Sequence, residues 1–85
     1  MHKHWSHDDA EALLADIDAS STNNCLKVAS ALRREFGDSG AEMFLDWCKT
    51  AHNWNEQWAR TTYRRADTTR AGMGLLVTMA RSGGF

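Results

Sequence analysis

Apolar residues recur at helical spacing along most of this chain, and this periodicity constrains the fold more than any other feature. In the stretch SHDDAEALLADID they follow the i, i+3, i+4, i+7 pattern of a helix with one buried face. Ser6 and Asp9 stand three residues apart at its start, which is the spacing of a capping box. We therefore predict a helix that begins after Ser6. Its buried face would consist of Ala10, Leu13, Leu14 and Ile17.

Four further segments show helical spacing. The polar run ASSTNN ends the first helix and caps a second over CLKVASALRREF, which stops at Gly37. A third is expected to open at SGAE, where Ser39 and Glu42 have capping-box spacing. A fourth follows Asn55 as its cap, and a fifth covers about Met73 to Arg81. The buried face of the second helix is expected to consist of Cys25, Val28, Ala29, Leu32 and Phe36. That of the third is expected to consist of Met43, Phe44, Trp47, Cys48 and Ala51, and that of the fifth of Leu75, Leu76, Met79 and Ala80.

These segments predict an all-α fold, a small bundle of four to five short helices. No run of alternating polar and apolar residues argues convincingly for a strand. Eighty-five residues suffice for one domain, and we expect a flexible N-terminus over residues 1–5 and a single helical domain over residues 6–85. Hydrophobic residues make up 42% of the chain and charged residues 25%, which is ordinary for a globular protein.

Nothing in the sequence predicts membrane insertion or export. No stretch approaches the ~20 apolar residues that span a bilayer. The segment MHKHWSHDDAEALL lacks the apolar core of a signal peptide, so a cytoplasmic protein is expected. Cys25 and Cys48 are too few for a disulfide framework, and we interpret them as buried free thiols, although a bridge between their helices is geometrically possible.

Charge is distributed unevenly along the chain. The net charge is −1, but residues 1–46 hold nine acidic and four basic side chains, whereas residues 47–85 hold two acidic and six basic ones. These balances of −5 and +4 permit one positive face on a nearly neutral protein.

The stretch NWNEQWARTTYRR combines aromatic and basic residues in one predicted helix. With Trp58 set at zero on a helical wheel, Arg60 falls at about 200° and Arg64 at about 240°. We therefore expect Trp58 to point into the core and the two arginines to point together into solvent. Trp47 and Trp54 are likewise interpreted as structural rather than base-stacking, with Trp54 placed before the cap to pack on Ala59.

The basic residues remain open to two interpretations. They are either a solvated helix face or a surface that contacts phosphates or an acidic partner, because the guanidinium fork matches paired oxygens. As a nucleic-acid signal the charge density is modest. The candidate binding residues are Arg60, Arg64, Arg65, Arg70, Lys49 and Arg81.

The segments CLKVASAL, FGDSGAEMFLDWCKTA, WNEQWARTTYRR and GMGLLVTMARSGG together resemble the primase C-terminal type-2 domain, a small helical module of replication proteins in phages and mobile elements. The resemblance covers roughly residues 10 to 85. Its pattern is matched by Val28, Ala31, Leu32, Trp47, Trp58, Gly74, Leu76, Ala80 and Gly83 or Gly84. The chain departs from it at Cys25 in place of a tryptophan, Cys48 in place of a serine and Leu75 in place of a threonine, and by a short segment between Trp47 and Trp58.

The resemblance implies an accessory role in replication: helping a primase or primase–helicase to engage template DNA or a partner subunit. Single-stranded DNA is then the expected ligand, although a replication protein partner remains an alternative. The oligomeric state is left open. A second reading is a stand-alone protein–protein interaction module, a phage-like adaptor or inhibitor, with exposed Trp5, Trp54 or Phe85 as anchors.

We expect no enzymatic activity, cofactor or metal site. A primase polymerase site needs clustered carboxylates that hold metal ions, and a helicase motor needs a phosphate-binding loop; the sequence contains neither pattern. The histidines His2, His4 and His7 lack the further ligands of a structural metal site, and Cys48 with His52 lacks a third orienting group for nucleophilic catalysis.

Overall fold

The structure is a computed structural model that describes residues 5–69 and 71–82. Its elements, in chain order, are α1 (His7–Leu14), α2 (Thr22–Phe36), the 3-10 helix η1 (Gly37–Gly40), α3 (Ala41–Cys48), α4 (Glu56–Arg64) and α5 (Met73–Ser82). The described ranges contain helices and turns but no strand. The prediction of a small all-α bundle is therefore confirmed.

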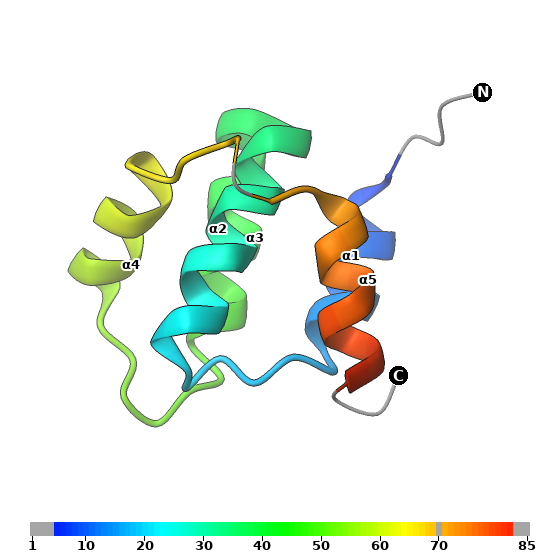
Figure 1. Cartoon of the computed structure of the whole chain (residues 1–85). Helices are drawn as coiled ribbons and strands as arrows, with labels where there is room; N and C mark the ends of the chain where they lie inside the picture. Colours follow the sequence, from blue (N-terminus) through cyan, green and yellow to red (C-terminus); the bar gives the residue numbers. More distant parts are fainter. Residues whose placement is uncertain (1–4, 70, 83–85) are drawn as a thin grey trace.

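The helices form three layers (Figure 1). Helices α2 and α3 pack on each other in the middle, α1 and α5 cover one side, and α4 lies alone on the other side. The largest fully buried side chains belong to the middle layer and to α5, and they are Phe44, Leu32, Leu76 and Val28. Because α4 has neighbours only on its inner side, most of its surface faces solvent.

Local capping signals set the starts of several helices. Asp9 N–H donates to Ser6 Oγ at 3.1 Å and Ser6 N–H donates to Asp9 Oδ2 at 3.2 Å, so the predicted capping box is present. Ser21, within the run ASSTNN, caps α2 by accepting from Asn24 N–H at 3.3 Å. Helix α1 ends at Leu14, before the apolar pattern does, yet Ile17 is still buried because the turn after α1 keeps it on the core.

The predicted capping box at Ser39 and Glu42 is wrong. Gly37, at φ 61°, ends α2, and the chain then winds directly into η1, which continues into α3. Helix α3 has no side-chain cap, and Ser39 Oγ instead donates to the carbonyl of Phe36 at 2.8 Å. The preceding 3-10 turn replaces the cap, since Ala41 N–H donates to the Asp38 carbonyl.

Most predicted core positions are buried, including both cysteines, which are free thiols as expected. Outside α4, the exceptions are half-buried and lie at helix ends or on the rim of the bundle: Phe36, Ala51, Leu75 and Met79. Among the residues that the structure describes, no helix has the length and apolarity that a membrane crossing requires.

Candidate nucleic-acid interface

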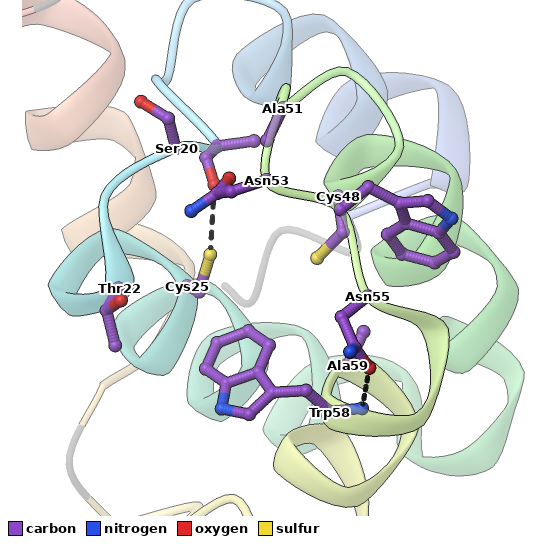
Figure 2. Close-up of a pocket in the computed structure, with 11 residues that line it drawn as sticks. Ser20, Thr22, Cys25, Cys48, Ala51, Asn53, Asn55, Trp58 and Ala59 are labelled. Atoms are coloured by element: carbon purple, nitrogen blue, oxygen red, sulfur yellow. Dashed lines mark hydrogen bonds between the residues drawn. The ribbon is translucent and has the colours of Figure 1, made fainter.

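Helix α4 carries three of the predicted basic residues and is fixed by a cap and two buried residues. Asn55 Oδ1 accepts from Trp58 N–H at 2.8 Å, as the sequence predicts for the cap (Figure 2). Ala59 and Tyr63, four residues apart, are the buried positions of the helix and face α3 and α2.

Tyr63 anchors the end of α4 to the rest of the bundle. Its hydroxyl donates to the Gly37 carbonyl, and its own carbonyl accepts from Arg33 Nη1 at 3.3 Å. Its ring lies 5.5 Å from the ring of Phe44, centroid to centroid. Burial raises the pKa of Tyr63 to about 12, so the hydroxyl is a hydrogen-bond donor at neutral pH.

The prediction that Trp58 points into the core is wrong. Its side chain is 41% exposed, whereas Ala59 is completely buried. A helical wheel with the largest side chain placed inward predicts a buried indole. Helix α4 instead turns its Ala59–Tyr63 stripe to the bundle, which puts Trp58 roughly 100–140° away from that stripe. The exposed indole therefore lies on the same side of α4 as Arg65, roughly 120–160° around the helix from Arg64 and Arg60.

Arg60 and Arg64 lie together on one flank of α4, as predicted. With Arg33 and Asp38 they line a hollow of about 220 Å³ between α4 and the η1–α3 junction. Arg60 Nε also donates to Glu56 Oε2 at 3.0 Å, in a pair whose side chains are 51% and 59% exposed. An exposed pair of this kind contributes only about 0–1 kcal/mol, so an anionic ligand can compete for Arg60.

Arg65 lies on the other flank of α4, beside Trp58. Both residues line a hollow of about 350 Å³ between α2 and α4, together with Leu26 of α2. Arg64 and Arg65 are exposed and form no ion pair within 4.0 Å among the described residues. The two flanks together give α4 three cations and one aromatic ring on its solvent side.

The other predicted basic residues are not on this surface. Lys49 follows α3, where its Nζ lies 3.6 Å from Asp46 Oδ1 and 6.0 Å from the centre of the Trp54 ring. Arg81 is exposed in the last turn of α5, on the far side of α2 and α3 from α4 (Figure 1). Arg70 lies outside the described residues.

A model of the family described as Primase C terminal 2 (PriCT-2) matches residues 10–80, which is most of the chain. This chain belongs to the PriCT-2 family. Comparison with curated proteins and with solved structures finds no match.

The structure divides the PriCT-2 positions that the sequence resemblance identified into two groups. One group is buried in the core and explains the fold: Val28, Ala31, Leu32, Trp47, Leu76 and Ala80. Trp47 is held there by its indole N–H, which donates to the carbonyls of Leu14 and Ile17 at 3.0 and 3.1 Å. Trp58 and Gly74 are exposed, and Gly83 and Gly84 lie outside the described residues.

A further hollow of about 260 Å³ opens on the other face of Trp58. Figure 2 shows the Trp58 ring reaching toward Thr22 and Cys25 of α2, with the sulfurs of Cys25 and Cys48 facing the same space. Cys25 Sγ donates to the Ala19 carbonyl at 3.2 Å. The neighbouring Cys48 thiol lowers the pKa of Cys25, and the Cys25 thiol together with burial raises the pKa of Cys48.

Sequence reasoning did not assign Arg33 or Leu26 to the site. Both lie on α2, and only the packing of α2 against α4 brings them to the two hollows. The sequence indicated only that Arg33 and Leu26 lie outside the apolar stripe of α2. Among the described residues there is no group of three histidine, cysteine or carboxylate side chains that could hold a metal ion, and His2 and His4 lie outside them.

Proposed function

We propose that this PriCT-2 chain is a non-catalytic accessory module of a phage or mobile-element replication protein, and that it binds single-stranded DNA on the outer surface of α4. The family relates the chain to the C-terminal part of primases. The observation that carries the proposal is the exposed side of α4, where Trp58 and Arg65 line one flank and Arg60 and Arg64 line the other. Guanidinium groups beside an aromatic ring are the common components of single-strand binding surfaces.

The affinity of this surface for single-stranded DNA should depend on salt concentration. Three arginines that each neutralise one phosphate of a single strand give a slope of about −2 in log affinity against log salt. Raising the salt concentration fourfold, from 50 to 200 mM, should then weaken binding roughly 20-fold. Fluorescence anisotropy of a labelled 20-nucleotide oligo(dT) at both concentrations measures this slope.

Two variants with the same loss of charge locate the surface. Arg64→Ala removes a cation from α4 and should lower both the affinity and the salt slope, whereas Arg81→Ala removes one from α5 on the opposite side and should change them little. Circular dichroism confirms that both variants remain folded. If the parent does not bind at 50 mM salt, or if both variants weaken binding equally, α4 is not a DNA-binding surface.

A protein partner is the second candidate function. It is favoured by Leu26 and Trp58, whose side chains are 45% and 41% exposed and line the same hollow. Exposed tryptophans are frequent anchors of protein interfaces. Pull-down with a candidate primase or helicase polypeptide tests this function. Retention of the partner by the parent and its loss with Trp58→Ala, without any DNA binding, would favour it.

A further inference from the structure

Within the proposed function, on which this inference rests, we propose that the hollow between α2 and α4 holds a nucleobase of the single strand, stacked on the indole of Trp58. The outer surface of α4 would then bind DNA in two ways. The arginines would hold phosphates, and the hollow would bind a base.

The first reason is the position of the exposed apolar side chains. Leu26 and Trp58 are the two large hydrophobic residues that stay exposed among the residues described, and both line this hollow although they lie on different helices. Single exposed apolar residues are ordinary, but apolar residues that meet around a concave space indicate a binding site. The hollow measures about 350 Å³, within the range of small-ligand sites.

The second reason is the chemistry of the surrounding wall. Arg65 stands seven residues after Trp58, so it lies on the same face of α4 two turns later, roughly 10 Å along the axis. Thr61 and Thr62 are half-buried on the wall and offer hydroxyl groups to the edge of a base. Asp67 also lines the hollow, but its Oδ1 already accepts from Thr69 N–H at 2.9 Å and from Thr69 Oγ1 at 2.6 Å.

The small extent of the exposed apolar surface favours a nucleobase over a protein as the occupant of the hollow. Stable protein interfaces bury at least about 1,000 Å² and centre on several apolar anchors. Here one indole and one leucine flank a hollow whose rim carries Arg65. An aromatic ring beside a cation matches a nucleotide, which has a flat apolar base next to a negative phosphate.

The experiment compares oligo(dT) with an abasic strand of the same length, which keeps every phosphate and lacks the bases. The parent should bind oligo(dT) more tightly than the abasic strand. Trp58→Ala should weaken oligo(dT) binding roughly 10-fold and leave abasic binding unchanged, because stacking on an aromatic side chain contributes about 1–3 kcal/mol per base. Trp58→Phe should retain much of the preference, and Leu26→Ala should reduce it less than Trp58→Ala.

The possible outcomes separate the two proposals. If the parent binds both strands equally and Trp58→Ala binds oligo(dT) as well as the parent, base stacking is refuted while phosphate binding by α4 stands. If no strand binds at 50 mM salt, the proposed function fails and this inference fails with it. If no strand binds but Trp58→Ala abolishes binding to a primase or helicase polypeptide that the parent retains, the hollow is a protein docking site and the inference is overturned. Circular dichroism melts check that each variant is folded.

Discussion

Tyr63 packs against Gly40, and replacing Gly40 by alanine tests whether Tyr63 fixes the position of α4. A Cβ at position 40 would stand 2.5 Å from Tyr63 Oη and 3.2 Å from Phe36 Cβ. It would also stand 3.3 Å from the Leu32 carbonyl oxygen. The Tyr63 ring would have to move by about 1 Å to reach an ordinary contact distance. That movement would break the hydrogen bond from its hydroxyl to the Gly37 carbonyl.

The expected cost follows from these contacts. Overpacking a core costs about 1–3 kcal/mol, and a lost hydrogen bond of a buried hydroxyl costs about 1–3 kcal/mol. The lower backbone entropy of alanine in the unfolded chain offsets about 0.5–1 kcal/mol, since Gly40 has helical φ and ψ of −83° and −7°. We expect Gly40→Ala to lower the free energy of unfolding by about 2–3 kcal/mol.

A double-mutant cycle isolates the contribution of the Tyr63 hydroxyl. Tyr63→Phe removes the atom nearest to the new methyl group, so Gly40→Ala should cost less in that background than in the parent. The losses of unfolding free energy in the two single variants should add up to about 1–2 kcal/mol more than the loss in the double variant. Urea unfolding followed by circular dichroism at 222 nm measures all four proteins.

Gly74→Ala serves as the matched control. No heavy atom lies within 4 Å of a Cβ at that position, so the same substitution in α5 should be neutral or stabilising, by up to about 1 kcal/mol. If the effects of Gly40→Ala and Tyr63→Phe add to within about 0.5 kcal/mol, the methyl group does not meet the hydroxyl. The reasoning that fixes α4 through Tyr63 would then be refuted.

Three further predictions concern pH, thiol reactivity and charge. Tyr63 is the one tyrosine of the chain, so absorbance at 295 nm should show its titration centred near pH 12 in the folded protein. Because the raised pKa favours the protonated folded state, up to about 3 kcal/mol of folding stability should be lost as the pH rises from 10 to 12. A folded-state midpoint near pH 10 would contradict this prediction. Iodoacetamide at pH 8 should modify Cys25 before Cys48, as read by mass spectrometry, because the neighbouring Cys48 thiol lowers the pKa of Cys25 while both residues are equally buried at 4%. Cys48→Ala should slow that reaction, and equal rates at the two thiols would contradict this order of the pKa values. Glu56→Gln frees Arg60 from its ion pair and removes a negative charge, so it should tighten oligo(dT) binding by up to about fivefold in the anisotropy titration. Weaker binding by this variant would instead show that the Glu56–Arg60 pair orients Arg60 for binding.

The sequence predicted some structural elements better than others. Ser6 with Asp9, and Asn55 before α4, act within one helical turn, so the starts of α1 and α4 were predictable from the sequence. Gly37 was predictable as a helix end for the same local reason. The box at Ser39 and Glu42 failed because a 3-10 turn already satisfies the N–H groups that such a box would cap.

Trp58 shows why the candidate site was not fully predictable. Side-chain size alone favoured an inward indole, but a helix of nine residues with only Ala59 and Tyr63 buried can rotate to satisfy its partners. The rotation is set by the hydroxyl bond to Gly37 and the ring contact with Phe44, which come from distant parts of the chain. The exposed positions of Arg60 and Arg64 were predicted, whereas their grouping with Arg33 was not.

By itself, the sequence of this protein determined which segments are helical, where most of them begin and end, and which residues are apolar enough to form a core. These properties depend on hydrogen bonds and periodicity within a few residues of each position. Only the tertiary structure decided which face α4 turns outward and which side chains of α2 meet it. That choice depends on contacts between residues 26 to 37 positions apart, such as Tyr63 with Gly37 and Ser30 with Asp67, which no local pattern encodes.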